Sequence, residues 1–173
     1  GQSRSAVVCG ASVNLAKFEE WENLPQFIED IMRFLDNALG FFIKSAPDTL
    51  MRAKYSAMRE RSVSLGVMGF ASLLQAKQIT FDSVSAKMWN KRIFKYLHEE
   101  VGKASIKLAG EKGACPDAED YGAIERFSYK LAILDTENIS KLAGGVSNAV
   151  EPLDCNIDQM CLIEMAAARA EFI

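Results

Sequence analysis

The stretch from Arg59 to Ala71, with the sequence RERSVSLGVMGFA, constrains the fold more than any other part of the chain. Its charged start gives way to a short apolar run, and a leucine-rich helical pattern follows at once. This order predicts a buried strand that leads into a helix. Gly66 and Gly69 interrupt the run, and glycine permits a tight turn or a close approach by a neighbour. On these residues alone, a core strand and helix without chemistry is the simpler interpretation.

Length and composition indicate one ordinary globular domain. The 173 residues are 49% hydrophobic and 25% charged, with a formal net charge of −3. This balance favours neither a nucleic acid nor an anionic membrane as a partner. No apolar run reaches the ~18 residues of a membrane span, and the polar start lacks the apolar core of a signal peptide. We therefore expect a cytoplasmic protein with reduced thiols.

The residue types that hold metals are sparse and poorly spaced. The cysteines Cys9, Cys115, Cys155 and Cys161 include no C-x-x-C pair of the kind that binds metal ions. The single histidine, His98, falls inside a helical pattern, which argues against a Ser-His-Asp triad or a histidine-rich metal site. We expect no metal site and no cofactor bound by this chain.

Two long helical patterns and three short apolar runs organise the rest of the chain. Apolar residues recur at helical spacing after Pro25, and again after Ser83 as far as the glycines at 110 and 113; either Asp82 or Ser83 is the expected cap of this second helix. The second helix would be ~40 Å long at ~1.5 Å per residue. Short β-type runs predict strands near 6–9, 63–67 and 131–134. The sequence thus predicts a predominantly helical α/β fold.

Five blocks resemble, in order, motifs of the catalytic (large, alpha) subunit of ribonucleotide reductases. VCGASVNL at 8–15 is similar to V-x-C-x-L-[AS]-S-V-N-L, and RSVSLGVMGF at 61–70 to R-x-[IL]-G-[LI]-G-V-x-G-[FL]. KGACP at 112–116 resembles E-K-G-A-C-P, the stretch 132–140 resembles A-I-A-P-T-x-S-I-S, and 144–152 resembles G-G-x-S-x-x-[IV]-E-P. Their order and spacing identify the chain as a member of this family over roughly positions 7 to 156.

The resemblance implies a ten-stranded α/β barrel that reduces ribonucleotides at the 2′ carbon by radical chemistry. Residues 1–156 would be an internal barrel segment, and 157–173 a divergent C-terminal helix. The family's finger loop N-x-C-x-E, which carries the radical cysteine, is absent. We expect a chain that is inactive alone and is completed by a complementary reductase chain or by self-association. The alternative is a repurposed, non-catalytic structural or interaction protein.

The resemblance also implies a redox thiol at Cys9, one of two cysteines that deliver reducing equivalents and end as a disulfide. Between Cys9 and Asn14 the chain is one residue shorter than the family pattern. One deleted residue reverses the face to which a strand side chain points. A buried, inert thiol therefore stays open as the alternative.

A second implied site is a strand-to-helix turn that holds substrate phosphates in the family. Free amides at a helix N-terminus and the helix dipole favour an anion there. The implied ligand is a nucleotide, and the matching positions are Thr136, Glu137, Asn138, Ile139 and Ser140. Asp135 stands where the family has proline and puts a negative charge near the phosphate position. It would otherwise cap the helix, with Thr136 and Ser140 as ordinary helix residues.

Overall fold

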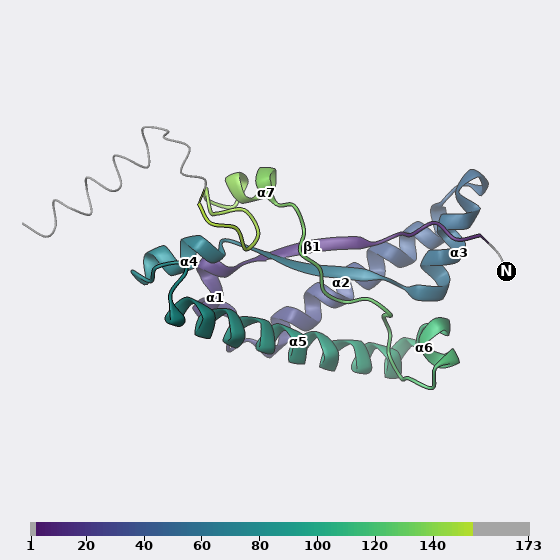
Figure 1. The fold of residues 1–173 in the computed structure, drawn as a ribbon. Helices are drawn as coiled ribbons and strands as arrows, with labels where there is room; N and C mark the ends of the chain where they lie inside the picture. The colour runs from purple at the N-terminus through teal and green to yellow at the C-terminus, as the bar shows by residue number, and fades with distance from the viewer. Residues whose placement is uncertain (1–2, 154–173) are drawn as a thin grey trace, which may run out of the picture.

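Two parallel strands form the sheet in this computed structural model, which describes residues 3–153. Strand β1 (Cys9–Asn14) pairs with β2 (Val63–Met68), in a register that runs from Cys9 opposite Val63 to Asn14 opposite Met68. A third segment follows the other edge of β2 through an isolated parallel bridge between Leu65 and Leu131. The fold is a partial, mainly helical α/β segment and not a closed barrel (Figure 1).

Two of the three strand predictions need correction. The first strand begins at Cys9 rather than ending there, because β2 starts at Val63 and offers no partner to earlier residues. The run 131–134 forms no regular strand. After the Ala132 N–H donates to the Leu65 carbonyl at 3.3 Å, the chain crosses the sheet and Leu134 comes to lie over Gly10. The prediction at 63–67 is confirmed.

The long helices α2 (Pro25–Ser45) and α5 (Val84–Lys112) cover one face of the strands (Figure 1). Both were predicted from their apolar spacing, and both pack against each other through fully buried side chains. The Ser83 hydroxyl accepts a hydrogen bond from the Ala86 N–H at 3.1 Å, so of the two expected caps it is Ser83 that caps the helix. The core of these helices comprises Ile28, Met32, Leu35, Leu39, Ile93, Leu97, Val101 and Leu108.

Short helices connect these elements and close the ends of the sheet. They are η1 (Leu15–Lys17), α1 (Phe18–Trp21), η2 (Asp48–Leu50), α3 (Met51–Glu60), α4 (Phe70–Ala76), α6 (Pro116–Asp120) and α7 (Glu137–Leu142). In Figure 1, α7 lies on the opposite side of the strands from α5. The sheet is therefore covered by long helices on one face and approached by a short helix on the other.

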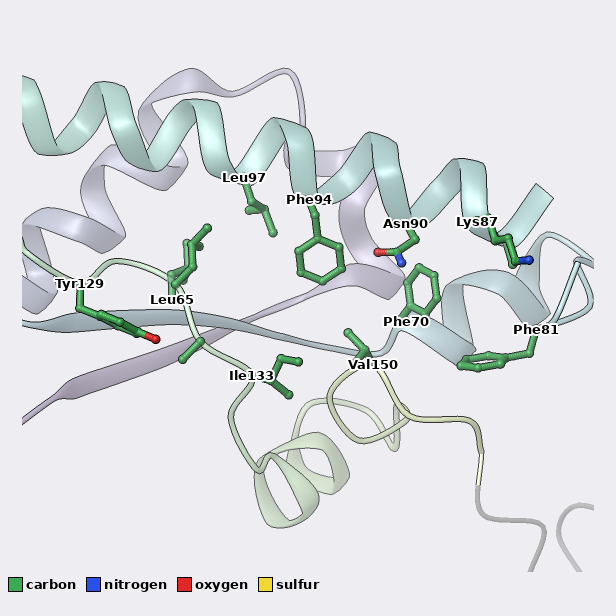
Figure 2. Close-up of a pocket in the computed structure, with 13 residues that line it drawn as sticks. Leu65, Phe70, Phe81, Lys87, Asn90, Phe94, Leu97, Tyr129, Ile133 and Val150 are labelled. Carbon is green, nitrogen blue, oxygen red and sulfur yellow. The ribbon is translucent and has the colours of Figure 1, made fainter. Parts of the chain in front are cut away.

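An apolar groove of about 660 Å³ lies between α5 and the segment that follows β2 along its open edge (Figure 2). Phe94 and Leu97 of α5 face Tyr129 and Ile133 across it, and Val150 lines the same groove. Ile133 is 75% exposed. The apolar side chains that line this groove are thus not covered by other parts of residues 3–153.

One expectation concerns residues that the structure does not describe, and others concern features that the described residues lack. The helix predicted at 157–173 lies outside residues 3–153. Within that range, no helix combines the length and apolar character that crossing a membrane requires. Residues 3–153 also bring together no group of three histidine, cysteine or acidic side chains that could hold a metal ion.

Candidate functional site

The carboxyl ends of β1 and β2 meet the loop after α7 through Asn14. The Asn14 side-chain oxygen accepts from the Ala16 N–H at 2.9 Å, and its amide nitrogen donates to the Ala143 carbonyl at 3.3 Å. One side chain at the end of a strand therefore fixes both the turn that follows β1 and the C-terminal end of α7. Ligand sites in α/β folds commonly lie at this end of parallel strands.

Gly69 ends β2 in the left-handed region, with φ of 81°, and starts α4. A Cβ added here would lie 2.9 Å from the Asn14 side-chain oxygen and 3.3 Å from the Val146 Cβ. The Gly69 N–H donates to the Ser147 carbonyl at 2.8 Å, which joins the strand end to the loop after α7. Both the backbone conformation and the crowding require glycine, so the predicted strand–glycine–helix unit is confirmed with a specific reason.

Thr136 and Asn148 form a buried polar junction beneath α7. The Asn148 side-chain oxygen accepts from the Thr136 N–H at 2.8 Å and from its hydroxyl at 2.7 Å. The Thr136 hydroxyl in turn accepts from the Ala149 N–H at 2.8 Å. Because Thr136 is only 1% exposed, these bonds hold the start of α7 and the loop at 144–149 in one arrangement.

The five residues predicted to hold phosphate do surround the N-terminus of a helix, α7. Thr136 and Ser140 are buried, and the Ser140 hydroxyl donates to the Glu137 carbonyl at 3.0 Å. The carboxylate of Asp135 accepts from the Glu137 N–H at 3.1 Å and so takes one of the free amides. The amides of Asn138 and Ile139 occupy the next two helix positions, which have no intrahelical partner.

A cavity of about 420 Å³ adjoins α7 and has a mixed polar lining. Lys141 lines this cavity, and its ammonium group is paired with the Glu137 carboxylate at 3.1 Å. Asn148 donates to Glu151 at 2.9 Å on the same lining. The lining therefore combines one paired cation, Lys141, with two carboxylates, those of Glu137 and Glu151, and with hydroxyl and amide groups of Ser140, Ser147 and Asn148.

Cys9 lies away from this cavity, on the other face of the sheet. Cys9, Ala11 and Val13 alternate onto the face that packs against the helical core, whereas Gly10 faces Leu134. Burial raises the pKa of the Cys9 thiol, which favours its protonated, less reactive form. Cys9 is only half-buried, and both its redox role and the buried-thiol alternative stay predictions.

Ser64, which replaces the first glycine of the family pattern, lies on the same face as Gly10. Its hydroxyl is buried and has no hydrogen-bond partner within residues 3–153. A Cβ added at Gly10 would lie 3.0 Å from this hydroxyl, so the two strands are closely packed there. An unpaired buried hydroxyl costs about 1–3 kcal/mol.

Comparison with known proteins agrees with this geometry. The family model described as the ribonucleotide reductase barrel domain matches residues 2–148 of this sequence. This chain belongs to the ribonucleotide reductase barrel-domain family. A large subunit of ribonucleoside-diphosphate reductase from Invertebrate iridescent virus 3 is 39% identical over 156 residues, and one from Invertebrate iridescent virus 6 is 41% identical over 154.

The match to these reductases covers nearly all of this chain but only part of theirs. It spans 90% and 89% of the chain, against 24% and 16% of the two viral proteins. The alpha subunit of a class Id ribonucleotide reductase from Actinobacillus ureae superposes with a TM-score of 0.84 at 38% identity. That similarity covers 90% of this chain and 30% of the solved one.

Two residues of this region, Asn14 and Asn148, were not singled out from the sequence as site residues. Asn14 binds the Ala143 carbonyl, 129 residues away, and Asn148 binds Thr136, 12 residues away. Both fall inside blocks that resemble the reductase family, so the motifs contained the signal. What the motifs did not show is that these amides bind backbone and hydroxyl groups of the protein itself.

Proposed function

We propose that this chain contributes the substrate-phosphate end of a ribonucleotide reductase barrel. In this proposal, the phosphates of a ribonucleoside di- or triphosphate bind at the N-terminus of α7. The amides of Asn138 and Ile139 and the ammonium group of Lys141 supply the contacts. The observation that carries the proposal is the Thr136–Asn148 junction, which holds that helix end fixed beside a polar cavity at the carboxyl ends of two parallel strands.

The reductase chemistry itself would need a partner in this proposal. The 173 residues contain no N-x-C-x-E motif, so the radical cysteine would come from another polypeptide segment. Reduction at the 2′ carbon consumes two electrons and releases the 2′ hydroxyl as water, while two thiols become a disulfide. Within residues 3–153 the thiols are Cys9 and Cys115, and Cys115 is fully buried. We therefore propose that a complementary reductase chain supplies both the radical and a redox cysteine.

Nucleotide binding by the chain tests the first part of the proposal. Isothermal titration calorimetry should show that the chain binds cytidine diphosphate. The affinity should weaken about tenfold in Lys141→Ala, because one charge-assisted contact contributes about 1.5 kcal/mol. Lys95→Ala is the matched control, since Lys95 also pairs with a glutamate one helical turn away, at 3.8 Å. Equal affinities in the two variants would place the nucleotide elsewhere.

Turnover tests the second part of the proposal. The purified chain should not reduce any ribonucleoside di- or triphosphate, with or without a radical-generating subunit. Addition of a reductase alpha-subunit segment that carries the finger loop should restore deoxyribonucleotide formation. Turnover by the chain alone would show that the radical centre lies within these 173 residues.

A further inference from the structure

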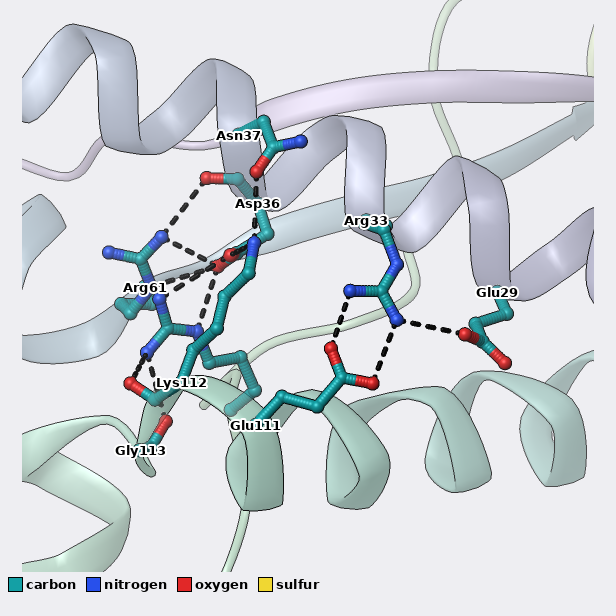
Figure 3. Close-up of polar contacts among 9 residues, drawn as sticks. Glu29, Arg33, Asp36, Asn37, Arg61, Glu111, Lys112 and Gly113 are labelled. Atoms are coloured by element: carbon teal, nitrogen blue, oxygen red, sulfur yellow. Dashed lines mark hydrogen bonds and ion pairs between the residues drawn. The ribbon is translucent and has the colours of Figure 1, made fainter.

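A buried carboxylate at the other end of the sheet is surrounded by three cations (Figure 3). Asp36 of α2 is 2% exposed. Its carboxylate accepts from Arg61, just before β2, at 2.6 Å, and from Lys112, at the end of α5, at 3.0 Å. Arg126, which follows α6, donates to the same carboxylate at 2.9 Å. Four separate segments thus converge on one acid.

This cluster carries more positive than negative charge. Burial by itself raises the pKa of Asp36, but the hydrogen bonds from Arg126, Lys112 and Arg61 outweigh it and lower that pKa. Asp36 is therefore ionised, and it balances only one of the three cations. The side chains of Arg61 and Arg126 are 12% and 11% exposed, so their charges are poorly screened by water. An anion that enters beside them would gain from the uncompensated charge.

A cavity of about 410 Å³ opens onto the cluster along one face of α2. Asp36, Gly40 and Lys44 line it at intervals of four residues, and Lys44 adds a fourth cation to the lining. A Cβ on Gly40 would have a single neighbour within 4 Å, the Arg61 guanidinium at 3.9 Å. Glycine costs a helix interior about 1 kcal/mol relative to alanine, and no close contact demands it here. Its missing side chain leaves the guanidinium open to the cavity.

The neighbouring acids on α2 and α5 are already engaged with other cations. Glu29 accepts from Arg33 at 2.9 Å and from Lys107 at 2.8 Å. Glu111 binds the same arginine with both oxygens, at 2.5 and 3.0 Å (Figure 3). These pairs account for the acids that flank the cluster. These acids therefore leave the net positive charge of the cluster unbalanced. Its cations donate otherwise to neutral oxygens, the carbonyls of Asp36, Lys112 and Gly113 and the side chain of Asn37.

We propose that this cavity, the Asp36 pocket, binds an anion through a phosphate group. The phosphate would lie over Gly40, between the Arg61 guanidinium and the ammonium groups of Lys44 and Lys112. Arginine and lysine are the usual partners of phosphate oxygens. The pocket adjoins the amino end of β2, whereas α7 adjoins the carboxyl ends of the strands. It is thus a second anion site that does not depend on the proposed function.

Inorganic pyrophosphate is the probe, titrated calorimetrically into the full 173-residue chain at low ionic strength. Gly40→Leu should fill the cavity, keep every cation and weaken binding at least tenfold. Gly110→Leu is its control, because Gly110 is also helical and has nothing within 4 Å of an added Cβ. Both substitutions favour helix, and circular dichroism should confirm that each variant folds.

A variant that removes one positive charge provides a second, independent test of the proposal. Lys44→Gln should weaken pyrophosphate binding about fivefold, whereas Lys91→Gln, on the exposed side of α5, should leave it unchanged. Lys141→Ala should retain the Gly40-dependent binding, which separates this pocket from the α7 site. Adenosine diphosphate that binds more tightly than pyrophosphate would identify a nucleotide as the source of the phosphate, and equal affinity would identify a free phosphate. The absence of pyrophosphate binding, or equal binding by wild type and Gly40→Leu, would overturn the proposal.

Discussion

Replacing Gly69 by alanine tests whether the strand end is built on a close approach as well as on a left-handed turn. Gly69 has φ of 81°, and a Cβ there would lie 2.9 Å from the Asn14 side-chain oxygen. The alanine must adopt a left-handed conformation and must also displace Asn14. Asn14 holds the Ala16 N–H and the Ala143 carbonyl, so both hydrogen bonds would be lost together.

The two effects have separable magnitudes. The left-handed conformation costs a residue with a Cβ about 1–2 kcal/mol. Each of the two Asn14 hydrogen bonds contributes about 1 kcal/mol to the free energy of unfolding. Gly69→Ala should therefore lower that free energy by about 3–4 kcal/mol. Gly122→Ala should cost only the conformational part, about 1–2 kcal/mol, because Gly122 has φ of 73° and nothing within 4 Å of an added Cβ.

Urea denaturation followed by circular dichroism at 222 nm measures both variants against the wild-type chain. The difference between the two substitutions isolates the cost of displacing Asn14. Gly69→Ala should also weaken cytidine diphosphate binding, because the Ala143 contact fixes the end of α7. If Gly69→Ala costs no more than Gly122→Ala, the crowding at Asn14 is not what requires glycine, and the reasoning fails.

Three further predictions concern the buried charge, acid stability and the apolar groove. Asp36→Asn should destabilise the chain by about 3–5 kcal/mol in urea, because it leaves buried cations without their counterion; loss under 1 kcal/mol would contradict this. Because the folded-state pKa of Asp36 is lowered, its contribution is complete above the unfolded pKa of about 3.9 and is lost as the pH falls below it. The wild-type chain should therefore lose stability more steeply than Asp36→Asn below pH ~4 in acid titrations. Finally, the wild-type chain should self-associate at micromolar concentration in light scattering. Ile133→Asp in the groove should make it monomeric, whereas Ile124→Asp should not, although Ile124 is similarly exposed, at 71% against 75% for Ile133. Identical masses for these two variants would exclude the groove as the contact.

The sequence predicted those elements whose causes are local. Apolar spacing and a proline in the first turn placed α2, and a serine cap with terminal glycines placed α5. The strand–glycine–helix unit at Gly69 followed from a short apolar run and a break in it. The family motifs indicated the barrel and the position of the α7 turn. These signals lie within a few residues of the structure that they specify, so a single sequence contains them.

The candidate site was only partly accessible in this way. The motifs located Thr136 and Ser140, but their burial and internal hydrogen bonds appear only when the loop at 144–149 packs onto α7. The sequence raised two orientations for Cys9 and did not choose between them. Strand register places Cys9 opposite Val63 and on the face with Ala11 and Val13, while its redox role stays a prediction.

Only the tertiary structure decided the features that join distant parts of the chain. The run at 131–134 has strand propensity, yet Leu134 crosses the sheet because Gly10 and Gly66 leave a flat face for it. Asp36 meets Arg61, Lys112 and Arg126 across separations of 25, 76 and 90 residues. Local periodicity and capping are set by neighbours in sequence. Charge balance, cavities and strand register are set by neighbours in space, and those depend on how every element packs.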